Sequence, residues 1–257
     1  MDNQYPKRQR MASKNVTDKQ LVPKEVEKAT SFGDELGGTE IVDIFVGPQQ
    51  KHFKVHKKLL CKKVPYFHKM FLGGFKEAIE HTARLPDDDP DVFDLFLDWL
   101  YRGDLHPADM SKQPPASSPV PKLIELYGFA EKICMNDLID YTMTSIITRS
   151  RHDKVMPRLS SIKLAYQVTS PGSPLRSWIS RCYLYSLLNG STTTHAATLD
   201  GFSNAMSSSN DLQKDVLRLI YFGDAKTRAS KAPVYENPCL YHMHGKGEIC
   251  PCGKEAQ

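Results

Sequence analysis

The sequence predicts an α+β fold within the broad α/β class, with a small mixed sheet flanked by helices and then an all-helical extension. Three observations carry this prediction. Two short β-prone runs, Ile41–Val46 and His52–Val55, are separated by Gly47-Pro48, which predicts a hairpin. A third β-prone run, His81–Leu85, is preceded and followed by helical patterns. From residue 90 onward the apolar residues recur at helical spacing.

Short helices are expected between the hairpin and the third strand. The segment Lys57–Cys61 changes to helical spacing, and Pro65 can occupy the first turn of a second helix that continues through Tyr66–Phe71. Gly73-Gly74 then ends this helix, because glycine adopts the left-handed conformation at little cost.

An acidic run, Asp87-Asp88-Asp89, precedes Pro90 and an apolar segment that ends near Tyr101. Asp89 is expected to be the N-cap of a long buried helix, with Pro90 at its first position. A metal site built from the three aspartates is an alternative, but helix capping explains them more simply. The apolar residues cover most of this helix, so we expect it to be buried on several sides.

Several motifs follow one another in a fixed order in this region: Asp43 within the first strand, Phe53-x-Val55-His56, Leu59-Leu60, Tyr66-Phe67, Met70-Phe71-x-Gly73-Gly74-Phe75-x-Glu77, Leu85-Pro86, and Phe93–Tyr101 before Gly103. Their order resembles the BTB/POZ domain. With the helical pair that follows, the resemblance covers about residues 39–150. It implies a protein-interaction module rather than an enzyme, and no G-x-S-x-G or H-E-x-x-H motif occurs in the sequence.

The rest of the chain divides by composition. Residues 1–38 predict a disordered basic tail, and residues 104–121 hold a proline-rich stretch that predicts a flexible loop, longer than is usual in the family. Residues 151–225 predict the helical extension, with a loop expected over Asn189–Ser209. The run Tyr166–Tyr185 looks like the extension of fungal-type BTB proteins. Residues 226–257 form a Cys/His-rich tail.

The charge distribution argues against a nucleic-acid surface on the folded part. The chain of 257 residues carries a net charge of +4. Most of this excess positive charge lies in the first 30 residues, so the net charge reflects the tail rather than the folded core. Lys7-Arg8-x-Arg10 could serve as a nuclear address, but a solvated basic tail is the simpler interpretation. With neither a long apolar run nor a secretory signal, we expect an intracellular protein, cytoplasmic or nuclear, with no membrane span.

Asp43 and His56 form one candidate site. Asp43 interrupts an apolar strand, so its carboxylate needs a partner, and His56, where the following helix begins, is the candidate partner. The pair is expected to fix the hairpin to the following helix. A binding pocket is the alternative.

Phe75-Lys76-Glu77 forms a second candidate site. It matches the apolar-x-Glu element by which some BTB proteins bind a cullin scaffold, with Phe75 as an apolar plug and Glu77 as a hydrogen-bond acceptor. In the alternative interpretation, Phe75 simply packs against the Gly73-Gly74 turn.

The tail reads Cys239-x2-His242-x-His244-x5-Cys250-x-Cys252. Zinc prefers thiolate and imidazole ligands in a tetrahedron, so Cys239, His242, His244 and Cys250 are candidate ligands of a structural zinc ion. An unmetallated polar tail is the alternative. The spacing differs from that of the common nucleic-acid-binding zinc finger.

These observations favour a non-catalytic adaptor or self-associating scaffold that binds other proteins. The resemblance adds a cullin-type ubiquitin ligase as a candidate partner. A nuclear transcriptional scaffold and a zinc-dependent nucleic-acid binder are the alternatives, although nucleic acid is not the expected partner.

Overall fold

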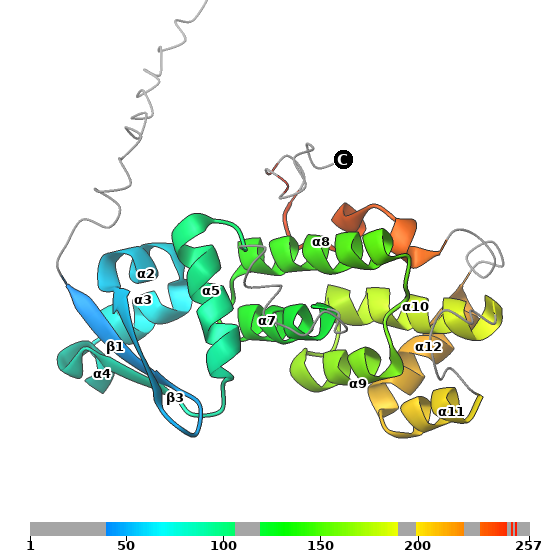
Figure 1. The fold of residues 1–257 in the computed structure, drawn as a ribbon, viewed down its shortest axis with the longest axis horizontal. Helices are drawn as coiled ribbons and strands as arrows, with labels where there is room; N and C mark the ends of the chain where they lie inside the picture. Colours follow the sequence, from blue (N-terminus) through cyan, green and yellow to red (C-terminus); the bar gives the residue numbers. More distant parts are fainter. Residues whose placement is uncertain are drawn as a thin grey trace, which may run out of the picture.

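The computed structural model describes residues 40–105, 119–189, 199–223, 232–245, 248 and 250. Within them, a small sheet with short helices lies at one end of the molecule and a stack of longer helices at the other (Figure 1). The predicted tail over residues 1–38 and most of the predicted loop over 104–121 lie outside the described residues. The predicted fold class is confirmed.

The sheet has the order β2-β1-β3. β1 (Ile41–Val46) pairs antiparallel with β2 (Lys51–His56) and parallel with β3 (Thr82–Leu85), so the sheet is mixed. Alternation along β1 buries Val42, Ile44 and Val46 and leaves Ile41, Asp43 and Phe45 on the outer face. The inner face therefore belongs to the core.

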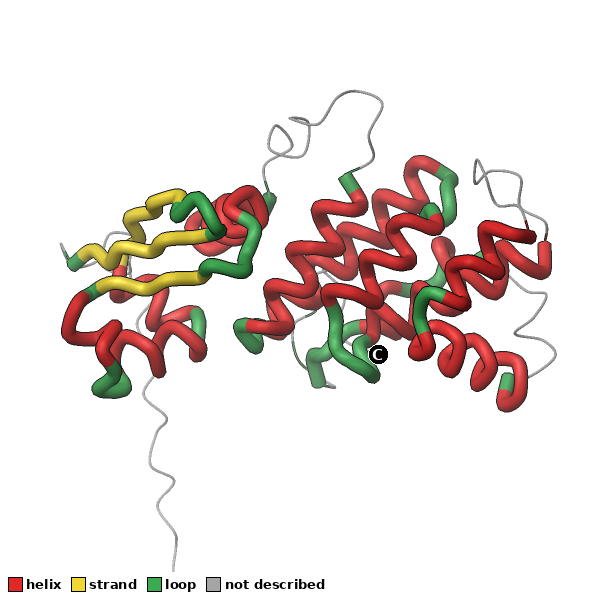
Figure 2. The backbone as a smooth tube through the Cα atoms, turned by 90° about the horizontal axis from the view of Figure 1, so that it is seen from below, coloured by secondary structure: helices red, strands yellow, loops and turns green. Residues whose placement is uncertain are grey.

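The helices α2 (Lys57–Lys63), α3 (Pro65–Leu72) and α4 (Lys76–Glu80) connect β2 to β3. They lie together on one side of the sheet (Figure 2). α5 (Pro90–Arg102) follows β3, and Asp89 caps it as predicted, because its Oδ1 accepts the N–H groups of Asp91 at 2.7 Å and Val92 at 3.2 Å.

An aromatic cluster joins the sheet to the helical stack. The Phe53 ring from β2 lies 4.9 Å from Phe93 on α5, and Phe93 lies 5.9 Å from Phe129 on the next helix. Phe96 also contacts Phe129, with ring centroids 5.4 Å apart. Offset and edge-on ring pairs of this kind add to the stabilisation that comes from burial alone.

α7 (Val120–Lys132) and α8 (Asn136–Asp153) form an antiparallel pair, α9 (Leu159–Val168) packs against α7, and α10 (Pro174–Asn189) packs against α9. α11 (Leu199–Ser207) and α12 (Asn210–Phe222) complete the described helices. α7 and α9 meet at Gly128, where an added Cβ would lie 2.5 Å from the Val168 carbonyl oxygen. None of the described helices has the length and apolar character needed to cross a membrane.

Two local predictions are wrong. α11 lies within the Asn189–Ser209 stretch that was expected to be a loop. Phe202 and Ala205 are buried there, and the Tyr183 hydroxyl donates to the Phe202 carbonyl oxygen at 2.6 Å, so tertiary packing outweighs a composition poor in helix formers.

The apolar residues at helical spacing before Asn136 predict a buried Cys134, but Cys134 is exposed. It lies in the turn between α7 and α8 with φ at 55°, so its side chain is directed by turn geometry rather than by helical periodicity.

The chain then returns to the helical stack. Two short 3-10 helices, η1 (Pro233–Tyr235) and η2 (Pro238–Tyr241), lie beside α8 and α10 (orange in Figure 1). Val234 and Tyr241 are buried against these helices. The C-terminal residues described by the structure are thus part of the folded body.

Candidate functional site

An exposed apolar surface lies where α3 turns into α4. Leu72, Phe75 and Ile79 are 56%, 58% and 78% exposed, and Glu77 stands on the same short helix. We call these four residues the α4 face. Large apolar side chains that are exposed together are typical of protein interaction sites.

The turn before α4 holds Phe75 in place. A Cβ at Gly73 would lie 3.0 Å from the Phe75 ring and 2.2 Å from the Lys69 carbonyl oxygen, so only glycine fits beneath the ring. Gly74 has φ at +75°, a conformation that suits glycine. The ring thus packs against the turn, as the alternative interpretation expects, while Phe75 remains 58% exposed.

The predicted pairing of Asp43 with His56 is wrong. Both residues lie on the outer face of the sheet, but the Asp43 carboxylate is 2.6 Å from His52 Nε2. His56 Nδ1 lies 2.9 Å from the Tyr101 hydroxyl, which also accepts the His56 backbone N–H. The strand register explains the difference. Asp43 lies opposite Lys54, so its diagonal neighbours are His52 and His56. Because His56 contacts Tyr101 of α5, His52 is the histidine that pairs with Asp43.

The aspartates before α5 take part in helix capping and ion pairs. Asp89 caps the helix and lies 3.2 Å from Lys122 Nζ, and Asp88 lies 2.6 Å from Lys132 Nζ. Lysine ammonium groups fill the positions that a cation would take, so the capping interpretation fits these residues.

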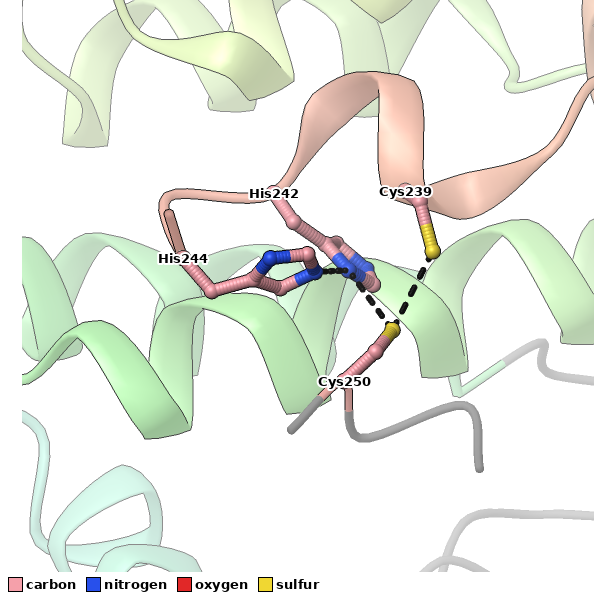
Figure 3. A group of neighbouring side chains, drawn as sticks. All are labelled: Cys239, His242, His244 and Cys250. Carbon is pink, nitrogen blue, oxygen red and sulfur yellow. Dashed lines mark hydrogen bonds between the residues drawn. The ribbon is translucent and has the colours of Figure 1, made fainter. Parts of the chain in front are cut away.

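The Cys/His residues of the tail come together after η2, as Figure 3 shows. Ligand atoms of Cys239, His242, His244 and Cys250 all lie within 4.8 Å of one another. The sulfur atoms are 3.1 Å apart, His242 Nδ1 is 3.1 Å from His244 Nε2, and Cys250 Sγ is 3.4 Å from His242 Nδ1. Four ligands at zinc bonding distance would be separated by roughly 3.3–3.8 Å, so the cluster fits one tetrahedral ion. Cys252 lies outside the described residues.

The nitrogen atoms that do not face the cluster have partners of their own. His242 Nε2 lies 2.9 Å from the Thr144 hydroxyl on α8, and His244 Nδ1 lies 3.3 Å from the Gly245 carbonyl oxygen. Histidines that ligate a metal generally engage their second nitrogen in this way, which fixes the tautomer and the ring orientation.

Burial and the neighbouring imidazole of His244 lower the pKa of His242 to about 4. His242 is therefore neutral near pH 7, as a metal ligand must be.

A buried carboxylate beneath the cluster was not anticipated from the sequence. Asp140 of α8 is 2% exposed, and its two oxygens accept the backbone N–H groups of Met243 at 2.5 Å and His244 at 3.0 Å. Burial raises the pKa of Asp140, although the two donors oppose this effect. Asp140 and Thr144 are the residues of α8 that position the His242–His244 segment.

Comparison with protein families gives a match to the BTB/POZ domain over residues 34–149. The chain contains a BTB/POZ domain. This match covers the sheet, α2–α5, α7 and most of α8, and BTB domains mediate protein–protein interactions. The α4 face lies within the BTB domain. The Cys/His cluster follows the domain in sequence, but it rests on α8, the last helix of the domain.

Several curated relatives are similar to a part of this chain. Kelch-like protein 40a of Danio rerio is 29% identical over 80 residues, which are 31% of this chain and 13% of the relative. Kelch-like protein 30 of Mus musculus is 36% identical over 64 residues, or 25% and 11% of the two chains. Kelch-like protein 17 of Homo sapiens is 28% identical over 96 residues, or 37% and 14%. The chain thus spans a small fraction of the length of these relatives.

Proposed function

We propose that this chain is a non-catalytic adaptor whose BTB unit, residues 39–150, binds another polypeptide through the α4 face. The observation that carries the proposal is the exposure of Leu72, Phe75 and Ile79 on one short turn and helix. The helices and tail after residue 150 would then hold or position a second partner.

The α4 face has the composition of a small interface centre. Burial of an exposed aromatic anchor in a partner's pocket commonly contributes about 2 kcal/mol or more to binding. Glu77, two residues after that anchor and half-buried, offers a carboxylate that can accept hydrogen bonds from the partner. The apolar-x-Glu element favours a cullin N-terminal region as this partner, which would make the chain an adaptor of a cullin-type ubiquitin ligase.

Gel filtration of the full chain with a cullin N-terminal region tests this proposal. The wild-type chain should co-elute with the cullin region, and Phe75→Ala and Glu77→Gln should weaken co-elution. Phe222→Ala is the matched control, because Phe222 is also an exposed phenylalanine, 80% exposed, but lies at the end of α12. Elution of the wild-type chain apart from the cullin region, or equal loss in all three variants, would count against the proposal.

We also propose that the chain self-associates, as the resemblance to BTB proteins implies. Sedimentation velocity of the full chain over a concentration series tests this directly. A sedimenting mass equal to that of a monomer at all concentrations would refute self-association while leaving the cullin proposal intact.

An intracellular site of action, cytoplasmic or nuclear, belongs to the same proposal. Imaging of a tagged chain with and without residues 1–12, which contain Lys7, Arg8 and Arg10, separates the two compartments. A nuclear signal that depends on this segment would favour the nuclear scaffold.

We further propose that the Cys/His cluster holds one structural zinc ion. The two sulfurs and two ring nitrogens supply four ligands of the type that zinc prefers, which leaves no open position for catalysis. Metal analysis of the purified protein should give one zinc per chain. Cys239→Ser and Cys250→Ser should lose the ion, whereas Cys134→Ser, which changes an exposed cysteine outside the cluster, should retain it.

A further inference from the structure

The described C-terminal residues, 232–245, 248 and 250, cross from the extension to the BTB domain, and we call them the strap. Its first part is held at the junction of α8 and α10. Trp178 of α10 donates its Nε1–H to the Pro233 carbonyl oxygen at 3.3 Å. Arg151 of α8 donates to the carbonyl oxygens of Val234 at 2.9 Å and Glu236 at 2.7 Å.

The middle of the strap is anchored through one carboxylate. Glu236 forms an ion pair with Arg181 of α10 and accepts a hydrogen bond from the Tyr241 hydroxyl within the strap. Tyr241 is buried, so this polar group sits against the packed surface. The strap is thus tied to the extension before it reaches the cluster.

In the described part of the chain, the far end of the strap is hydrogen-bonded to α8 of the BTB domain. Residues 242–245 form neither helix nor strand, so backbone hydrogen bonds of regular structure do not hold them. Their described contacts with α8 are the two backbone bonds to Asp140 and the bond between His242 and Thr144. The bonds to Asp140 and the bond to Thr144 all require the His242–His244 segment to keep one conformation.

We infer that metal binding at the cluster clamps the strap to α8 and so locks the helical extension to the BTB domain, with Asp140 and Thr144 as positioning residues. The inference rests on the zinc centre proposed above. An ion bound to His242 Nδ1 and His244 Nε2 fixes both rings and the backbone between them. That backbone then presents its two N–H groups to Asp140 at no further cost in conformational entropy.

The coupling works in both directions, because linkage between two binding equilibria is reciprocal. If zinc orders the segment that Asp140 and Thr144 hold, these two residues must also strengthen zinc binding. Loss of partners in the second coordination shell typically costs 10–100-fold in metal affinity.

Competition between the full chain and a chromophoric chelator for Zn²⁺ tests the inference. Asp140→Asn and Thr144→Val should each lower the affinity about 10- to 100-fold. Asp137→Asn is the matched control, because it removes the same charge from an exposed position on the first turn of α8, and it should bind zinc as the wild type does. Thr144→Val retains the side-chain shape and guards against misfolding of the Asp140 variant.

Hydrogen exchange of the wild-type chain with and without Zn²⁺ provides the second measurement. Removal of zinc should accelerate exchange across the strap, including the amides of Met243 and His244. Equal zinc affinity in all variants, or exchange that is insensitive to zinc, would overturn the clamp while leaving the zinc centre intact. A chain that binds no zinc, including one in which Cys239 and Cys250 form a disulfide, would overturn both.

Discussion

Arg176 is the best single position at which to test how the extension is held together. It lies in the first turn of α10, just after the Ser170-Pro171-Gly172-Ser173-Pro174 segment, and its side chain is only 6% exposed. Its Nε donates to the Thr169 hydroxyl at 3.1 Å, and Nη1 pairs with Asp211 of α12 at 2.8 Å. Nη2 donates to the carbonyl oxygens of Tyr166 and Thr169 at the end of α9.

One guanidinium thus joins α9, α10 and α12, and Arg176→Ala removes all of these bonds. Breaking a buried pair by deleting one partner typically costs about 3–5 kcal/mol. Asp211 is 46% exposed and can be rehydrated, which lowers this cost, but each carbonyl oxygen left buried without a donor costs about 1–3 kcal/mol. We therefore expect a loss of about 3–4 kcal/mol. Arg176→Lys should recover part of it, because an ammonium keeps the charge but lacks the planar fork.

Urea unfolding monitored through Trp178 fluorescence measures this loss, since Trp178 is fully buried on the same helix. Arg218→Ala is the control, because Arg218 is 71% exposed and pairs only with Asp215 one turn away in the described structure, and it should change stability by less than about 0.5 kcal/mol. If Arg176→Ala costs less than about 1 kcal/mol, the three helices are not joined through this side chain.

Three further predictions concern other parts of the fold. Gly128→Ala should destabilise by about 1–3 kcal/mol despite the better helix propensity of alanine, because its Cβ would meet the Val168 carbonyl; a stabilised variant in urea unfolding would show that α7 and α9 are not closely packed. Asp89→Ala should cost about 1 kcal/mol at pH 7. Desolvation opposes ionisation of Asp89, but two backbone N–H groups and a lysine outweigh it and lower its folded-state pKa, so its contribution should be present above about pH 4 and decline as the pH falls further; a difference that does not change with pH would contradict this. Burial raises the thiol pKa of Cys61 and Cys182, so iodoacetamide should label both only after unfolding, and rapid labelling of the native chain would contradict their burial.

The strands and the central helix could be predicted because their signals are local. A β-prone run ended by Gly47-Pro48 leaves few alternatives to a hairpin, and Asp89 before Pro90 specifies a helix start within two residues. Where local signals conflict with packing, the prediction was wrong. The Asn189–Ser209 stretch was expected to be a loop, but it contains α11, in which Phe202 and Ala205 are buried.

The candidate sites also divide into features that the local sequence predicts and features that depend on packing. The grouping of the four Cys/His residues was predictable, because ligands of one ion lie close together in a short segment. Asp140 was not predictable, since it precedes Met243 by 103 positions and nothing local marks it as a partner of the tail. The Asp43–His56 pair was wrong because the sheet register places both His52 and His56 diagonal to Asp43, and Tyr101 of α5, which lies far away in sequence, engages His56.

The central claim is that the BTB domain binds another protein through the α4 face. Hydrogen exchange of the full chain, measured with and without a cullin N-terminal region, tests this claim most directly. Exchange centred on residues 72–80 should be slower when the partner is present. Protection confined to α12, or no protection at all in the complex, would contradict it.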